Sequence, residues 1–224
     1  MNLNVFEKFI LLSLDSKKGK FLIDTMSLNY GIAGAILMEL SELNKINIER
    51  KKLILVDSKL TKNQVIDGCI KLIYNSKKNR RIKYWINKIG NNSTGFKKQI
   101  LNELKLKGII KIEKNSFLWG LINIYRYPIL NTKPVDEQTS KLRKIVLENE
   151  KPDLESILLL SLMNSCKLTR ILFINKKENR AANKIIKELT QNIEISNTVS
   201  QALKEIQTAV LVATTSAFIG SSSN

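Results

Sequence analysis

Histidine is absent from the 224-residue sequence, which also has only two cysteines, Cys69 and Cys166, and three prolines. Without histidine, Ser-His and Cys-His catalysis, Cys₂His₂ zinc sites and histidine-based pH switches are excluded. Two cysteines are too few for a Cys₄ zinc site, and no pair of carboxylates stands out as catalytic. We therefore expect a protein that is not an enzyme and that carries no metal ion and no cofactor.

Long hydrophobic runs are missing too. The most apolar segment, Thr208 to Ile219, is shorter than the roughly 20 residues that span a bilayer, and we predict that it is a buried closing helix. The run from Phe9 to Leu14 follows charged residues and lacks a small-residue cleavage site, so no export signal is expected. These features predict a cytoplasmic protein with reduced thiols.

Acidic residues are scarce, with 20 Asp and Glu against 37 Lys and Arg, which gives a formal net charge of +17. Such an excess favours polyanions, either phosphate backbones or the anionic face of a membrane, and does not choose between them. A coding bias is the alternative explanation, because Lys, Ile and Asn are abundant throughout. At 43% hydrophobic residues, the chain is expected to bury a core rather than to be disordered.

Apolar residues recur at helical spacing along most of the chain. This pattern predicts a mainly α-helical protein, with a central apolar helix bundle ringed by amphipathic helices and one or two small β-hairpins. No long linker or internal repeat is evident, so we expect a single domain over residues 1–219 and a flexible tail over residues 220–224. The predicted helices cover residues 5–14, 28–43, 65–73, 82–89, 93–107, 134–148, 154–163, 175–189 and 197–218.

Two hairpins are predicted. The first joins residues 46–48 to 53–56, and the second joins 109–112 to 117–124 around a turn at 113–116. The second arm of the latter is strongly apolar, and it could pack on its own core, insert into a membrane interface or pair with a second subunit. The residues predicted for insertion or self-association are Phe117, Leu118, Trp119, Leu121 and Ile122.

A basic stretch from residue 77 to 98 contains no acidic residue. Its glycines at 90 and 95 have P-loop spacing, but Phe96 stands where the phosphate-binding lysine is required, so we do not expect an NTPase. Lys97 and Lys98 fall in the first turn of a predicted helix, where the helix dipole favours anions. A bound anion would remove this conflict, whereas a solvated basic surface is the simpler alternative. The predicted anion-binding residues are Ser93, Thr94, Gly95, Lys97, Lys98, Arg80 and Arg81.

The stretch from residue 93 to 124 also reads as a helix, a tight turn and a two-stranded wing. This arrangement resembles a winged-helix DNA-binding domain, so nucleic-acid binding is the alternative function. The predicted helix exposes mainly Lys97, Lys98, Asn102 and Lys105, which suit phosphates rather than base edges. The wing is also too apolar for a DNA backbone, so we do not expect a nucleic-acid partner.

Several segments stand in an order that is typical of one protein family. They are residues 9–15 with the lysine-rich turn 17–20, the glycine-containing helix 31–40, Asp67 with Ile70, residues 82–89 around Trp85, residues 104–110, Arg126-Tyr127-Pro128 and the closing segment 206–218. In this order they resemble the Golgi phosphoprotein 3 family in its shorter, bacterial-type form. The resemblance extends from about Leu3 to Ile219.

The resemblance implies one mainly helical domain with a projecting hydrophobic hairpin used in membrane contact or self-association. Eukaryotic members are peripheral membrane proteins that bind phosphatidylinositol 4-phosphate and help to retain Golgi glycosyltransferases through their cytosolic tails and coatomer. By this resemblance, a headgroup-binding Trp and Arg of the family correspond to Asp24 and Ala33. Two further arginines correspond to Thr94 and Lys97, and of these positions only Lys97 keeps the charge.

We therefore expect a non-catalytic peripheral membrane protein of the cytoplasm that binds anionic phospholipid headgroups. Further candidate partners are the cytosolic tails of membrane proteins and a second copy of the chain, bound through the hairpin at residues 109–127.

Overall fold

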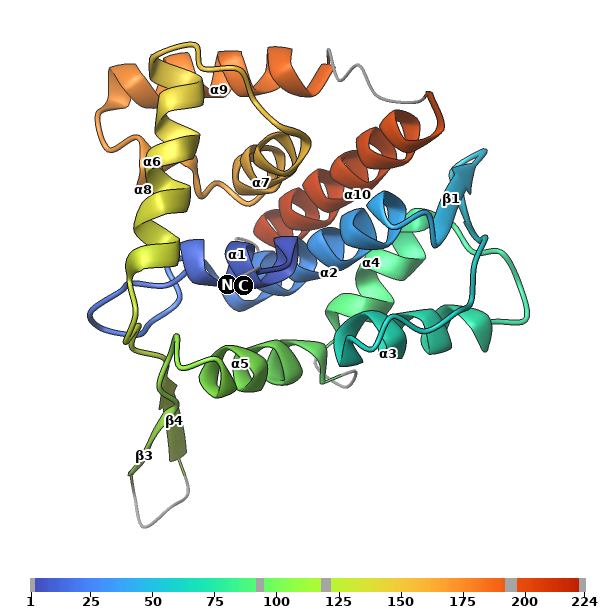
Figure 1. Cartoon of the computed structure of the whole chain (residues 1–224), viewed down its shortest axis with the longest axis horizontal. Coiled ribbons are helices and arrows are strands. Elements are labelled where there is room, and N and C mark those ends of the chain that lie inside the picture. Colours follow the sequence, from blue (N-terminus) through green and yellow to red (C-terminus); the bar gives the residue numbers. More distant parts are fainter. Residues whose placement is uncertain (1–2, 92–94, 118–121, 192–196, 222–224) are drawn as a thin grey trace.

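The computed structural model describes residues 3–91, 95–117, 122–191 and 197–221, and within them it contains ten helices and two two-stranded antiparallel hairpins (Figure 1). This confirms the predicted mainly α-helical class. The helices are α1 (Val5–Leu12), α2 (Thr25–Glu42), α3 (Gln64–Tyr74), α4 (Ile82–Gly90), α5 (Phe96–Leu106), α6 (Lys133–Leu147), α7 (Leu154–Ser165), α8 (Thr169–Leu172), α9 (Lys176–Gln191) and α10 (Asn197–Ser221). The strands are β1 (Ile46–Glu49), β2 (Lys52–Leu55), β3 (Glu113–Phe117) and β4 (Ile122–Arg126).

Helix α2 is the centre of the fold, with 13 of its 18 residues buried. Helices α1, α4, α7 and α10 pack against it (Figure 1). Glycines allow this close approach: a Cβ atom added at Gly34 would lie 2.6 Å from Val210 Cγ2, and one added at Gly31 would lie 2.2 Å from the Phe9 ring. The predicted apolar bundle therefore forms around the glycine-containing helix.

Amphipathic helices surround this bundle, as predicted. Helix α5 lies with α3 and α4 on one side of α2, and α6, α8 and α9 lie with α7 on the other (Figure 1). The short helix α8 was not predicted, because four residues are too few to show a helical period.

The closing helix differs from the expectation in two ways. It is only partly buried, because α10 packs on its neighbours through one face: Val210 is fully buried, whereas Leu211 and Val212 are 48% and 42% exposed. It also continues to Ser221, so Gly220 and Ser221 of the predicted tail are helical, and residues 222–224 lie outside the described residues. No helix in the described ranges is both long enough and apolar enough to cross a membrane.

The first hairpin agrees with the prediction. Strands β1 and β2 pair from Ile46 with Leu55 to Glu49 with Lys52, and Arg50 and Lys51 form the turn with φ angles of 48° and 63°. This two-residue turn with positive φ at both positions matches the right-handed twist of the strands.

The second hairpin has a different register from the one predicted. Residues 113–116, which were predicted to be the turn, belong to strand β3, and Glu113 pairs with Arg126 while Phe117 pairs with Ile122. Ile109 and Ile110, predicted to be a strand of this hairpin, are instead fully buried in the core at its base. The apolar pattern of residues 109–112 thus reflects core packing, and the hairpin proper begins four residues further on.

Candidate functional site

The candidate site is built around the first turn of α5. This helix begins at Phe96 rather than at Ser93, and its N-cap is Gly95, with a φ of 73°. That left-handed conformation favours glycine, and a Cβ atom there would meet no described atom within 4 Å. Ser93 and Thr94, which were predicted to bind an anion, lie outside the described residues. Within the part that the structure describes, α5 begins at an open glycine without a side-chain cap.

The first turn of α5 carries two lysines and no acidic residue. The N–H groups of a first helical turn have no acceptor within the helix and point towards its N-terminus, where the helix dipole is positive. Lys97 and Lys98 add two positive charges at this place. The turn is therefore electrostatically suited to an anion.

Lys97 is half-buried, while Lys98 is exposed. Burial lowers the pKa of the Lys97 ammonium group, and no carboxylate of the described residues pairs with it to offset this effect. A partly desolvated cation without a carboxylate partner gains from contact with an anion.

Pockets lie on both sides of these lysines. The smaller pocket, of about 70 Å³, lies between α5, the end of α4 and α2. Besides the two lysines, it is lined by Asn29, Ile32, Ile89, Gly90, Asn91, Gly95 and Phe96. The larger pocket, of about 290 Å³, lies between α5 and the base of the second hairpin. It is lined by Lys97, Lys98, Leu101, Asn102, Ile112, Tyr125 and Tyr127.

Arg80 and Arg81 do not join this site. Both precede α4, whereas the smaller pocket lies at the far end of that nine-residue helix, which is about 13 Å long. The Arg80 guanidinium lies 5.2 Å from the centre of the Tyr84 ring, and the backbone of Arg81 pairs with Lys52. The two arginines form a separate basic surface beside the first hairpin.

Asp24 and Ala33, which correspond to headgroup-binding residues of the family, supply no cation to the site. Asp24 is the N-cap of α2, and its carboxylate accepts the Ser27 N–H at 2.9 Å. Partial burial alone would raise the Asp24 pKa, but the hydrogen bonds from Ser27 lower it. Ala33 is completely buried in the bundle. Asn29, one turn before Ala33, lines the smaller pocket instead, and the i, i+4 spacing could have identified it.

Most residues of the larger pocket were not predicted from the sequence. Leu101 and Asn102 follow the two lysines by one helical turn, so their spacing on α5 indicates a shared face. Ile112, Tyr125 and Tyr127 come from the hairpin and its base, and only the tertiary fold brings them to α5.

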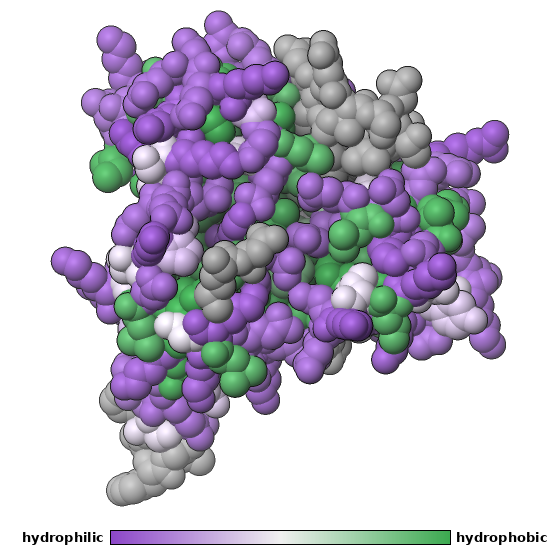
Figure 2. Space-filling model, viewed as in Figure 1, coloured by the Kyte–Doolittle hydropathy of each residue, from purple (hydrophilic) through white to green (hydrophobic). Residues whose placement is uncertain are grey.

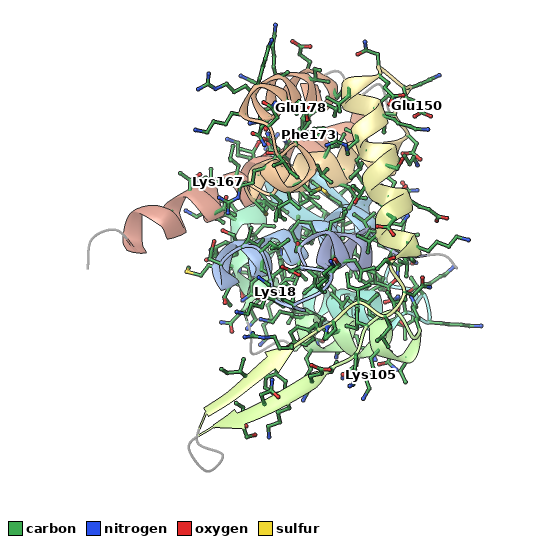
Figure 3. All side chains as sticks on the ribbon, turned by 90° about the vertical axis from the view of Figure 1, so that its left-hand side faces the viewer. Lys18, Lys105, Glu150, Lys167, Phe173 and Glu178 are labelled. Carbon is green, nitrogen blue, oxygen red and sulfur yellow. The ribbon has the colours of Figure 1, made fainter. Side chains whose placement is uncertain are left out.

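The second hairpin extends away from the helices (Figures 1 and 3). Of the residues predicted for membrane insertion or self-association, Leu118, Trp119 and Leu121 lie outside the described residues. Phe117 and Ile122 pair at the ends of β3 and β4. Apolar side chains are exposed near the hairpin base, where Figure 2 shows green patches: Leu106 is 86% and Leu130 63% exposed. The Tyr125 side chain of β4 is 47% exposed as well.

Metal binding and thiol chemistry have little support in the described part of the chain. No group of three or more His, Cys, Asp or Glu side chains there could hold a metal ion. Cys69 and Cys166 are buried and not disulfide-bonded, and burial raises the pKa of both thiols, which keeps them in the unreactive protonated form.

Comparisons with known proteins match most of the chain. A family model described as Golgi phosphoprotein 3 (GPP34) matches residues 5–210, a range that includes α5 and both hairpins. Vacuolar protein sorting-associated protein 74 of Schizosaccharomyces pombe is 30% identical over 155 residues. This alignment covers 60% of the present chain and 45% of that protein, so the similarity extends over less than half of the relative's length.

Proposed function

The chain belongs to the Golgi phosphoprotein 3 family, and on this premise we propose that it is a non-catalytic peripheral membrane protein that binds anionic phospholipid headgroups. The observation that carries the proposal is the first turn of α5, where Lys97 and Lys98 flank a helix N-terminus that no side chain of the described residues caps. By the family resemblance, Lys97 is the one headgroup-binding position at which a charge is expected to be kept, which supports this proposal.

A headgroup phosphate would satisfy three features of this turn at once. It would accept hydrogen bonds from the N–H groups of the first turn, interact favourably with the helix dipole and pair with the two ammonium groups. Each basic residue close to an anionic membrane contributes about 1 kcal/mol to binding, so the interaction is expected to be useful but sensitive to salt.

The exposed apolar residues at the hairpin base would provide the second contribution. Leu106, Tyr125 and Leu130 could enter the interface once the lysines have brought the protein to the membrane. The projecting hairpin supports the same orientation, because it extends from the side of the molecule that carries α5 (Figure 1).

We propose general binding of anionic headgroups rather than selectivity for phosphatidylinositol 4-phosphate. Asp24 and Ala33 supply none of the cationic or aromatic groups that the family resemblance assigns to these positions. An adaptor role on the cytoplasmic face of a membrane, with cytosolic tails of membrane proteins as ligands, is the corresponding proposal for partners. The protein-sorting name of the yeast relative supports it.

The test is co-sedimentation with vesicles of phosphatidylglycerol, phosphatidylinositol 4-phosphate or neutral lipid, at low and physiological salt. The double variant Lys97→Glu with Lys98→Glu is expected to weaken binding to anionic vesicles at least about thirtyfold, because two contributions of about 1 kcal/mol are lost and repulsion is added.

Lys176→Glu with Lys177→Glu is the matched control, because these lysines also stand in the first turn of a helix, on the opposite side of the molecule. Their reversal changes the net charge equally and is expected to have a much smaller effect. An equal loss in both variants, or none in either, would contradict the proposal. Tight binding of duplex DNA without vesicle binding would favour the nucleic-acid alternative.

A further inference from the structure

The larger pocket between α5 and the hairpin base combines an apolar lining with two positive charges. Its lining is mostly apolar, from Leu101, Ile112 and the rings of Tyr125 and Tyr127, and its charged residues are Lys97 and Lys98. Its volume of about 290 Å³ is just below the range of about 300–1,000 Å³ that is typical of small-ligand pockets. A pocket of this kind fits a small amphiphile with an anionic end and an apolar end.

The walls of this pocket are held by the surrounding fold. Leu101 belongs to the core and is only 3% exposed. Tyr127 packs on Phe21, with ring centres 5.5 Å apart, and its N–H donates to the Gly19 carbonyl at 2.8 Å. The pocket is therefore largely formed before a ligand arrives. Tyr125 is half-exposed on β4 and forms an outer part of the wall.

We propose that this pocket receives the apolar part of an anionic phospholipid whose phosphate is bound by Lys97 and Lys98. The volume suits the glycerol backbone and the first carbons of an acyl chain, and not a whole lipid. This inference rests on the proposed function of the α5 site and adds a second contact for the same ligand. A free phosphate or a deacylated headgroup would engage the lysines but leave the pocket empty.

Two soluble ligands with the same headgroup separate these contacts. Dihexanoyl-phosphatidylglycerol, kept below its micelle concentration, carries short chains, whereas glycerophosphoglycerol carries none. Calorimetric titration of the full chain is expected to show at least about tenfold tighter binding of the acylated ligand, since burial of two methylene groups suffices for a gain of that size.

Asn102→Phe tests whether this gain arises in the pocket. Asn102 lines the pocket but is exposed, so a phenyl ring there would occupy the space without disturbing the core. The variant is expected to lose the tenfold gain while its binding of glycerophosphoglycerol is unchanged. Asn115→Phe is the matched control: it makes the same substitution at an exposed position of β3 that does not line the pocket, and it should behave like the wild type.

Several outcomes would overturn the inference. These are equal binding of the two ligands, an unchanged gain in Asn102→Phe, the same loss in Asn115→Phe, or binding of neither ligand by a protein that still binds vesicles. If Asn102→Phe does not fold, Tyr125→Ser removes the outer wall and is expected to reduce the gain.

Failure of the proposed function has a different signature. In that case Lys97→Glu with Lys98→Glu binds anionic vesicles as the wild type does. If binding depends on the lysines but not on the acyl chains, the headgroup site stands and the acyl pocket is wrong.

Discussion

The two ends of α5 place lysines in opposite electrostatic surroundings. At the C-cap, the Lys107 ammonium group lies 2.6 and 2.7 Å from the two carboxylate oxygens of the completely buried Glu7. The helix dipole also favours a cation at that end. At the N-terminal end, Lys97 and Lys98 have the dipole against them, and Lys97 has no carboxylate partner among the described residues.

This difference distinguishes a charge that serves the fold from one that does not. Lys107 compensates a buried carboxylate that also accepts the Asn4 N–H and caps α1, so the pair ties α1 to α5. Lys97 makes no such contribution and is unfavourable to the folded state at neutral pH, because burial lowers its pKa. A charged residue that lowers the stability of the folded state is better explained by a role in binding.

The largest expected effect comes from breaking the pair at the C-terminal end. Lys107→Met leaves Glu7 buried without its cation, and the free energy of unfolding is expected to fall by about 3–5 kcal/mol in urea denaturation. Adding Glu7→Gln should recover part of this loss, because the buried charge is removed. Vesicle binding by the folded variant should be unaffected. A loss below about 1 kcal/mol would mean that the pair is not structural.

Helix α7 begins with a side-chain cap, Asp153, whereas α5 has none among the described residues. Partial burial would raise the Asp153 pKa, but hydrogen bonds from Lys141 Nζ and from Ser156 lower it to about 2. Since the folded-state pKa lies below the ordinary value of 3.8, the carboxylate stabilises the fold above about pH 4, and this stabilisation is lost as the pH falls towards 2.

Asp153→Ala is therefore expected to cost about 1 kcal/mol at neutral pH and to flatten the decline in thermal stability between pH 4 and 2. Thermal unfolding followed by circular dichroism measures both effects. An unchanged acid profile in the variant would show that the decline arises from other carboxylates.

The smallest expected effect has the opposite sign. Lys97→Met removes the cation from the start of α5, and the free energy of unfolding should rise by about 0.3–1 kcal/mol. The same variant should bind anionic vesicles more weakly than the wild type. Denaturation and co-sedimentation of one preparation would check both, and a destabilised variant would assign Lys97 a structural role.

The helices could largely be predicted from the sequence, because the 3.6-residue period of their buried faces is a local signal. The register of the second hairpin could not. Ile109 and Ile110 look like strand residues, but their burial is decided by the helices that pack on them. The polar residues of β3 lack the alternation that would fix a register.

The candidate site was predictable to the extent that it is local. Lys97, Lys98 and Gly95 lie within one turn and were identified from their sequence. Arg80 and Arg81 were grouped with them because they are near in sequence, whereas α4 separates the two groups in space. Tyr125 and Tyr127 reach α5 only through the hairpin, and no spacing rule along one helix could have included them.

The contact between Gly34 and Val210 also has a consequence for the synthesis of the chain. The ribosome makes the central helix α2 before α10, which contacts its Gly34 and follows the other nine described helices in the sequence. Until then, a helix that buries 13 of its 18 residues in the folded protein has an uncovered side that can associate with other chains. The nascent protein is therefore expected to depend on chaperones until α10 is made, and to complete its core only then.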